Sequence, residues 1–193
     1  MKSIVVFCGS SEGNDESFGK QAHELGKTLA QKNLVLVYGG AKIGIMGKVA
    51  NGALENNGKV VGVIPDFLKE REVFHNGLFK LIITKNMHDR KLKMHELSDG
   101  IIMLPGGFGT LEEFFEMLTW SQLGLHKHPI GILNTNGFYD DLLQMMQSMV
   151  HKGFVKEDNF KNILVDSEID SLLNKMEHHK PFEQQKRITK DQL

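Results

Sequence analysis

The sequence is poor in the features that mark several specialised classes of protein. Its 193 residues include one cysteine and one tryptophan, and the formal net charge is −1. A single cysteine excludes an internal disulfide framework and is typical of a reducing compartment. No apolar run approaches the ~20 residues that cross a bilayer, and the N-terminal "MKSIVVFCGSSEG" has too short an apolar core for a signal peptide. We therefore expect a cytoplasmic protein without membrane contact.

The charge balance also gives no electrostatic reason to expect a nucleic acid partner. Hydrophobic residues make up 40% of the chain and charged residues 24%, as in ordinary globular proteins. The length fits one domain with a sizeable core. The chain becomes polar from Glu177 onward. We predict a single domain over residues 1–180 and a polar C-terminal tail over residues 181–193.

Short apolar runs alternate with helical patterns along the chain. The expected strands lie near residues 3–8, 34–40, 60–65, 81–84, 100–107, 129–134 and 162–165. The expected helices lie near 16–31, 45–56, 87–97, 110–123, 139–152 and from 167. Most of the strands lack polar alternation, which is typical of parallel strands buried on both faces. The pattern predicts an α/β fold in which a doubly wound parallel sheet carries helices on both faces.

Three of these strands end in loops rich in small residues: "CGSSEG", "YGGAKIGIMG" and "LPGGFGTLEE". Parallel strands end at one edge of the sheet, and ligands bind there. Glycine permits close backbone approach, and a helix that follows offers free N–H groups to an anion. Any one loop could be a simple turn, but three together favour a phosphate or nucleotide cradle. Its candidate binding residues are Ser10, Gly39, Gly40, Gly44, Met46 and Gly106.

Sequence signals for a cofactor or a metal are weak. The loops match neither a Walker A motif nor the dinucleotide motif GxGxxG, because Glu112 stands where that motif needs its third glycine. We expect no cofactor. His126 with His128, and His178 with His179, are expected on the surface without a suitably spaced third ligand, so we expect no metal. Cys8 is expected to be an inert buried thiol.

The segment "MHDRKLKMHEL" places basic residues in the first turns of a helix. The helix dipole disfavours Arg90, Lys91 and Lys93 there. One explanation is a solvated face balanced by nearby carboxylates. The other is a bound anion, for which arginine is the best suited side chain.

The helix after "PGGFG" is apolar on two sides. At 100° per residue, one side gathers Leu111, Phe114, Phe115 and Leu118, and we expect it to pack on the sheet. The opposite side gathers Glu113, Met117 and Trp120. In a single-domain protein the second apolar side suggests a second copy of the chain, so we predict a homodimer with Met117 and Trp120 at its interface.

Two adjacent glutamates begin this helix and point 100° apart, so they cannot serve one site equally. Glu113 is expected near the glycine loop. Simpler alternatives exist: a favourable N-terminal charge for Glu113, and a capping box that pairs Glu113 with an N-cap at Thr110.

The motifs taken together resemble the Lonely Guy phosphoribohydrolases. "PGGFGTLEE" resembles the family signature PGGxGTxxE, and "MHDRK" resembles its upstream basic motif. "CGSS", "YGGAKIGIMG", "GVIP" and "LTWSQLGLHKHPIGILN" are also similar in order and type, so the likeness extends from about Ser3 to Val165. Ala41 replaces a common glycine, and Asp89 replaces the usual glutamate. These departures bear on substrate preference more than on activity.

The resemblance implies a homodimeric, Rossmann-like enzyme that binds a nucleoside 5′-monophosphate. Such enzymes hydrolyse the N-glycosidic bond of cytokinin riboside monophosphates, and often of AMP, to release the base and ribose 5-phosphate. The family's catalytic arginine and glutamate fall on Arg90 and Glu113. Its substrate contacts fall on Glu72, Lys91, Gly107, Phe108, Gly109, Thr110, Leu111, Glu112, Glu113 and Thr119.

This reaction would use the residues in distinct ways. The glycines and the helix N-terminus would hold the 5′-phosphate, and Thr110 would donate its hydroxyl. Glu113 would stabilise the cationic sugar, hold the ribose hydroxyls or activate water, and Arg90 would fix the substrate and assist departure of the base. Two alternatives remain: a nucleotide-binding or sensing module without turnover, and lysine decarboxylation, for which no pyridoxal phosphate motif is present.

Overall fold

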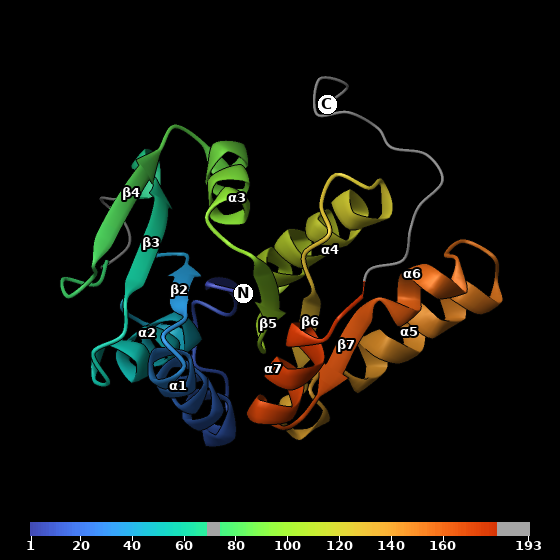
Figure 1. Ribbon diagram of the computed structural model, residues 1–193, viewed down its shortest axis with the longest axis horizontal. Coiled ribbons are helices and arrows are strands. Elements are labelled where there is room, and N and C mark those ends of the chain that lie inside the picture. The colour runs from blue at the N-terminus through green and yellow to red at the C-terminus, as the bar shows by residue number, and fades with distance from the viewer. Residues whose placement is uncertain (69–73, 181–193) are drawn as a thin grey trace.

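The chain folds around one seven-stranded parallel sheet in a computed structural model that describes residues 1–68 and 74–180. The strand order is β4-β3-β2-β1-β5-β6-β7, and every neighbouring pair is parallel. The strands are β1 (Ser3–Phe7), β2 (Val35–Tyr38), β3 (Val60–Pro65), β4 (Lys80–Thr84), β5 (Gly100–Met103), β6 (Ile130–Leu133) and β7 (Ile163–Asp166). The predicted doubly wound, single-domain α/β fold is confirmed (Figure 1).

Helices connect the strands as expected. They are α1 (Glu16–Gln31), α2 (Gly44–Leu54), α3 (Met87–Glu96), α4 (Phe108–Gln122), α5 (Asp140–His151), α6 (Glu157–Lys161) and α7 (Ile169–Glu177), with 3₁₀ turns η1 (Asp66–Leu68) and η2 (Thr135–Gly137). Helix α6 was not predicted, because five residues are too few to show a helical period. None of the described helices is both long and apolar enough to cross a bilayer. The expected tail at 181–193 lies outside the described residues.

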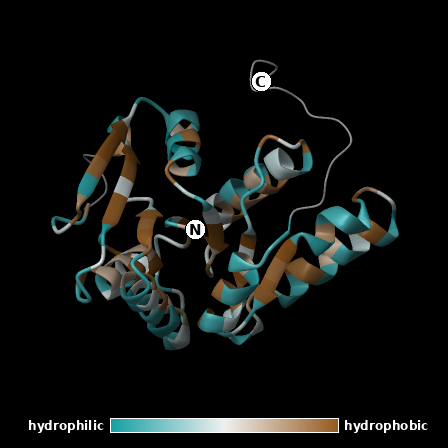
Figure 2. Cartoon of the chain, in the orientation of Figure 1, coloured by the Kyte–Doolittle hydropathy of each residue, from teal (hydrophilic) through white to brown (hydrophobic). Residues whose placement is uncertain are grey.

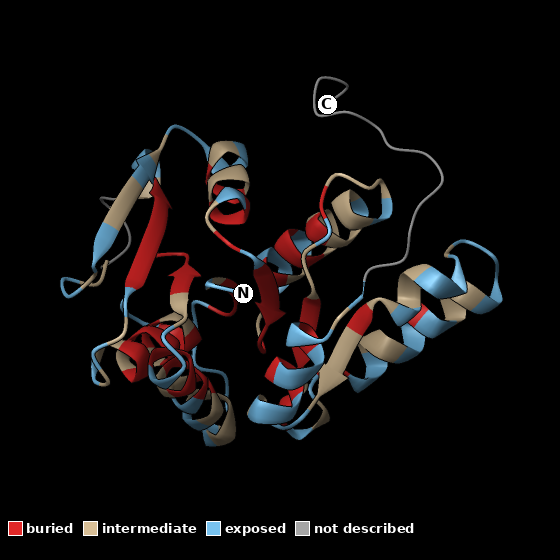
Figure 3. Cartoon of the chain, viewed as in Figure 1, coloured by how far each residue is buried: buried red, intermediate tan, exposed pale blue. Residues whose placement is uncertain are grey.

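The sheet is covered on both faces, which explains why its inner strands are mostly apolar. Ile4 and Val6 of β1 pack among residues of α1, α2 and α7. The alternate residues Val5 and Phe7 pack among residues of α3, α4 and α5. Figure 2 shows mostly hydrophobic strands beside helices that carry both hydrophilic and hydrophobic residues, and Figure 3 shows the central strands buried over most of their length. Cys8 is buried, as expected, and burial raises the pKa of its thiol, so it stays protonated.

Helix α4 is rotated about its axis relative to the prediction, so that of the predicted stripe only Phe114 is fully buried, together with Met117 of the opposite side. Phe114 and Met117 are fully buried in the core of the chain itself (0% exposed), whereas Leu111, Phe115 and Leu118 are only partly buried. The expectation that Met117 lies between subunits is therefore wrong. Both sides of the helix are apolar, so periodicity alone could not say which one faces the sheet.

Candidate active site

The site lies where the chain reverses its direction of winding. Strands β1 and β5 are neighbours in the sheet, and the strands that follow each one run outward to opposite edges. Such a switch point opens a crevice at the carboxyl ends of the strands. A cavity of about 290 Å³ occurs there, lined by Gly9, Ser10, Ser11, Glu12, Gly13, Phe18, Ile45, Pro105, Gly106, Gly107 and Phe138.

A larger hollow of about 600 Å³ adjoins this cavity. It is lined by Glu12, Gly13, Asn14, Asp15, Glu16, Gly19, Lys20, His23 and Lys48. Its walls come from α1, the loop before α1 and Lys48 of α2. Neither cavity is lined by Arg90 or Glu113, and the smaller one is the better candidate because its walls come mainly from the glycine loops at the switch point.

Backbone hydrogen bonds join the three glycine loops into one unit. The Gly9 N–H donates to the Pro105 carbonyl (3.1 Å), and the Met46 N–H donates to the Gly9 carbonyl (3.2 Å). The Ile45 N–H donates to the Ser11 carbonyl (3.3 Å). Two N–H groups of the first turn of α2 thus donate to carbonyls of the loop after β1, and they are not available to a ligand.

The three helix N-termini are consequently not equivalent, contrary to the simple picture of a shared cradle. In α1 the Asp15 side chain accepts from the Ser17 N–H (2.8 Å) and caps the helix. In α4 the N-cap is Gly107, which has no side chain to accept these N–H groups. The first N–H groups of a helix have no acceptor within it, so α4 is the one of the three best able to receive an anion.

The glycines of "PGGFGT" divide into two kinds. A Cβ at Gly106 would clash with the side chain of Thr110 and with the Gly9 nitrogen, so Gly106 is required by packing. A Cβ at Gly107 or Gly109 would meet no protein atom within 4 Å. Both are exposed, so the outer wall of the loop is open to a ligand. Helix α4 begins at Phe108, so Thr110 is buried inside its first turn and is not the N-cap.

Arg90 is a buried cation held over the carboxyl ends of β2 and β3 (6% exposed). Its Nε donates to the Val63 carbonyl (3.1 Å) and its Nη2 to the Gly39 carbonyl (3.4 Å). These bonds fix the guanidinium plane and leave Nη1 3.7 Å from Oε1 of Glu113. A Cβ at Gly39 would collide with this guanidinium, which explains the glycine there.

Glu113 is the buried carboxylate that faces Arg90, and it is 8% exposed. Burial raises its pKa from 4.5 to about 7, with Arg90 acting in the opposite direction and lowering it. A carboxyl with a pKa near neutrality can exchange a proton at physiological pH, as acid–base groups must. The structure thus brings together the two residues that the resemblance singled out as catalytic.

Glu112, one residue earlier, has a different environment. It is exposed and forms an ion pair with Lys91. Lys91 also pairs with Glu116, at 2.9 Å. The ammonium of Lys91 therefore links α3 to α4 through two carboxylates, and its expected substrate contact stays a prediction. Sequence reasoning missed Glu116, although glutamates at i and i+4 share a helix face and suggest a common cation.

The remaining expected contacts are placed as follows. Ser10 is exposed at the cavity. Gly44 has a φ of +67° and lies against the Ser10 carbonyl, where a Cβ would clash. Gly40 has a φ of +87°, and its carbonyl accepts from the His75 N–H (3.2 Å). The positive φ angles of Gly40 and Gly44 indicate that these two glycines are required for the backbone conformation of the loop after β2.

Other expected contacts lie apart from the Arg90–Glu113 pair. Phe108 is 94% exposed at the tip of the loop. Thr119 lies 11 residues further along α4, and its hydroxyl donates to the Phe115 carbonyl (2.8 Å). At a rise of 1.5 Å per residue, Thr119 lies about 16 Å along the axis of α4 from its first residue, Phe108. Within a single chain, Thr119 is therefore not at the cavity. Glu72 lies outside the described residues.

Two further features were not expected from the sequence. Tyr139 is buried, and its hydroxyl donates to the Leu104 carbonyl (2.8 Å). This hydrogen bond holds the residue that directly precedes the glycine loop. His126 is buried rather than on the surface, which corrects the expectation, and it lies near His128 and His95. His95 is 31 positions from His126, so spacing along the sequence could not reveal this contact.

Several known proteins are similar to this chain in sequence. A sequence profile described as "Possible lysine decarboxylase" matches residues 46–176. The cytokinin riboside 5′-monophosphate phosphoribohydrolase of Rhodococcoides fascians is 44% identical over 173 residues, which are 89% of this chain and 87% of that protein. A protein of the same name from Oryza sativa subsp. japonica is 42% identical over 180 residues, or 93% and 74% of the two chains.

This chain belongs to the cytokinin riboside 5′-monophosphate phosphoribohydrolase family. A family member from Arabidopsis thaliana is likewise 41% identical over 180 residues, which are 93% of this chain and 84% of that protein.

Solved structures resemble this phosphoribohydrolase family member in fold. The molybdenum cofactor binding protein of Rippkaea orientalis gives a TM-score of 0.69 at 21% identity, with 92% of this chain and 96% of that chain covered. The molybdenum cofactor carrier protein of Chlamydomonas reinhardtii gives 0.66 at 19% identity, with 91% and 95% covered. Identities this low support a shared fold only.

Proposed function

We propose that this protein hydrolyses the N-glycosidic bond of purine nucleoside 5′-monophosphates, either cytokinin riboside 5′-monophosphates or AMP, and releases the base and ribose 5-phosphate. The observation that carries the proposal is the buried Arg90–Glu113 pair beside the open N-terminus of α4. Relatives of that name, more than 40% identical over most of the chain, support it.

The residues divide the work as follows. The 5′-phosphate binds at the exposed N–H groups around Gly107 and Gly109, where the helix end adds positive potential. Cleavage places positive charge on the ribose, and the Glu113 carboxylate stabilises that charge or activates water. Arg90, held by two carbonyls, orients the substrate and assists the departing base. No metal or cofactor is assigned to any of these steps.

A binding or sensing module without turnover is the second candidate, because the same loops would hold a nucleotide. The Arg90–Glu113 pair favours the enzyme. A site that only binds phosphate gains nothing from a carboxylate whose pKa is raised to about 7 beside it.

The direct test is to incubate the untagged protein with AMP and with isopentenyladenosine monophosphate, and to quantify free base and ribose 5-phosphate by chromatography. Stoichiometric release of both products over many turnovers supports the proposal. Tight nucleotide binding without product would favour the sensing module.

The two kinds of glycine give a prediction about phosphate binding. We expect Gly107→Ala to fold normally, because its Cβ meets no protein atom and its backbone is extended (φ −99°, ψ −153°). The methyl group would obstruct the phosphate, so the KM for AMP should rise by about 10-fold or more, the equivalent of one charge-assisted hydrogen bond.

Gly106→Ala is the matched comparison, because its Cβ clashes with Thr110 and Gly9. It should lower the melting temperature as well as activity. A Gly107→Ala protein with an unchanged KM would place the phosphate elsewhere.

We also propose a homodimer, with the partly buried Trp120 of α4 covered by a second copy. Trp120→Glu should then shift the protein from dimer to monomer in size-exclusion chromatography with light scattering. Gln122→Glu, an exposed position on the same helix, is the charge control. A wild-type protein with the mass of a single chain would contradict the proposal.

A further inference from the structure

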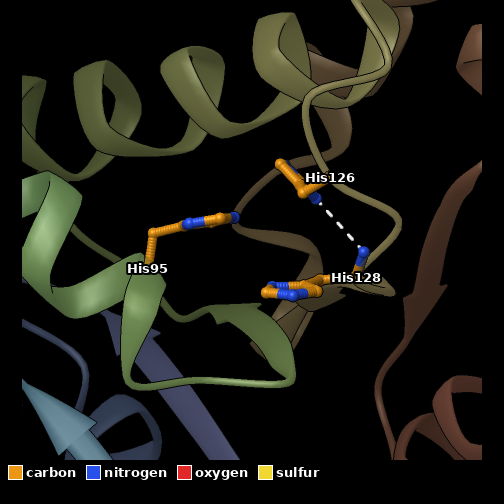
Figure 4. Close-up of side chains that lie close together, drawn as sticks. All are labelled: His95, His126 and His128. Atoms are coloured by element: carbon orange, nitrogen blue, oxygen red, sulfur yellow. Dashed lines mark hydrogen bonds between the residues drawn. The ribbon is translucent and has the colours of Figure 1, made fainter. Parts of the chain in front are cut away.

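Three histidines from two distant segments meet beside the C-terminal half of α4. His95 comes from the last turn of α3, and His126 and His128 come from the connection between α4 and β6 (Figure 4). The ring of His95 lies 4.8 Å from that of His126 and 4.7 Å from that of His128, between centroids. His95 and His126 are buried. We call these three residues the histidine cluster.

The ligand atoms of the cluster are close enough for one metal ion. One nitrogen from each ring lies within 4.8 Å of the others. Tetrahedral zinc, with Zn–N bonds of ~2.0–2.1 Å, places its nitrogen ligands about 3.3 Å apart. The rings of His95 and His128 are stacked with an interplanar angle of 17°, so one of them must turn as well as approach before both lone pairs point at one ion, and a water molecule can supply the fourth ligand.

The hydrogen bonds of His126 fix which of its nitrogens is the ligand. Its Nε2–H donates to the Met117 carbonyl (2.9 Å), so the lone pair lies on Nδ1. A backbone carbonyl that receives the second N–H is the usual support of a metal-binding histidine. Nδ1 accepts the His128 backbone N–H at 3.1 Å, a hydrogen bond that a metal would replace.

We propose that the histidine cluster binds one divalent transition metal of the zinc type, which ties α3 to the segment after α4. Imidazole ligands suit zinc, cobalt, nickel and copper and disfavour calcium and magnesium. The ion is structural: His95 lies five residues after Arg90, and α4 carries Glu113, so the ion secures the two helices of the proposed active site. The site is independent of the proposed reaction, which involves no metal.

The test uses the untagged, chelator-treated full chain with Co²⁺ and Zn²⁺ as probes. The ring of the single tryptophan, Trp120, lies 5.5 Å from that of His95, so Co²⁺ should quench its fluorescence with a stoichiometry of one ion per chain. Bound Co²⁺ should show the absorption of a tetrahedral site, and Zn²⁺ should displace it. Zn²⁺ should also raise the melting temperature by several degrees.

Single substitutions decide whether the cluster is the site. His95→Gln and His128→Gln should each weaken Co²⁺ binding by about 100-fold or more. His88→Gln, an exposed histidine of the same helix α3, should bind as the wild type does. Wild-type affinity in either cluster variant would overturn the proposal, as would the absence of stoichiometric binding.

One measurement needs no variant. X-ray absorption on the zinc-loaded wild type should show scattering from about three imidazole rings. A coordination shell made only of oxygen would also overturn the site. If the chelator instead abolishes nucleotide hydrolysis while the fold persists, the metal is catalytic and its structural role is wrong.

Discussion

Glu113→Gln is expected to lower kcat for AMP hydrolysis by at least about 10²-fold, since it removes the charge that stabilises the cationic sugar or activates water. Glutamine keeps the size of the side chain and one hydrogen-bonding oxygen. Substrate affinity should hold or improve, because a carboxylate near the bound phosphate is lost. Steady-state kinetics separate the two effects, as a fall in kcat with little change in KM.

Glu112→Gln is the matched control, one residue away on the same helix. Glu112 is exposed and paired with Lys91, whereas Glu113 is buried against Arg90. The control should therefore retain most of the wild-type kcat. If Glu112→Gln were inactive and Glu113→Gln active, the assignment of the carboxylate would be wrong.

The raised pKa of Glu113 also predicts how rate and stability depend on pH. If the carboxylate is the active form, kcat/KM of the wild type should rise with pH through about 7, and this rise should be absent in Glu113→Gln.

Folding stability should change in the opposite direction. The unfolded carboxyl ionises near 4.5 and the folded one near 7, so the wild type loses stability as pH rises across this window. Glu113→Gln does not lose it, so the difference in stability between the two proteins should shift in favour of Glu113→Gln as pH rises from 5 to 8, by on the order of 3 kcal/mol at most. Equal melting curves at pH 5 and pH 8 for the two proteins would contradict the burial of this group.

Arg90→Ala is expected to have the second large effect, on both binding and turnover. Arg90 satisfies the carbonyls of Val63 and Gly39 and faces Glu113. Its loss should reduce kcat/KM by about 10²–10³-fold. It should also destabilise the fold by roughly 3 kcal/mol, because a buried charge loses its partner.

The pH profile separates a catalytic effect from a purely structural one. Arg90 lowers the pKa of Glu113, so any residual activity of Arg90→Ala should rise at a higher pH than in the wild type. Arg90→Lys keeps the charge but cannot contact two carbonyls in one plane, and should recover only part of the activity. Lys93→Ala, on the same helix and paired with Glu96, is the control. If the pH profile of Arg90→Ala were the same as that of the wild type, Arg90 would not act on the pKa of Glu113, and the proposed pairing of the two residues in catalysis would be wrong.

The parts of the molecule that depend on local pattern were predictable from the sequence. The seven strands are short apolar runs, and the glycine loops follow three of them, so the fold class and the edge of the sheet that carries the candidate site could both be inferred. The pairing of Arg90 with Glu113 was less accessible. It depended on a resemblance between motifs, and the structure adds the carbonyls of Gly39 and Val63 that hold the guanidinium.

Features that depend on contacts between distant segments could not be predicted. Helix α4 is apolar on both sides, and its buried side combines Phe114 of the predicted stripe with Met117 and Glu113 of the opposite one. The sequence predicts that the N-terminus of α2 is open to a ligand, but carbonyls of the loop after β1 accept hydrogen bonds from two of its N–H groups. The histidine cluster joins residues 31 positions apart. Each of these three features depends on which segments of the chain pack together. The local periodicity of hydrophobic residues gives no information on such packing.

The central claim is that the open N-terminus of α4 holds the 5′-phosphate of a nucleotide whose glycosidic bond is then cleaved beside Glu113. The most direct test compares kcat/KM for AMP and for adenosine on the same protein by quantifying released adenine. We predict that adenosine is poorer by about 10³-fold or more, because charge-assisted hydrogen bonds to the phosphate and the potential of the helix end are both lost. Equal values of kcat/KM for adenosine and AMP would contradict the account.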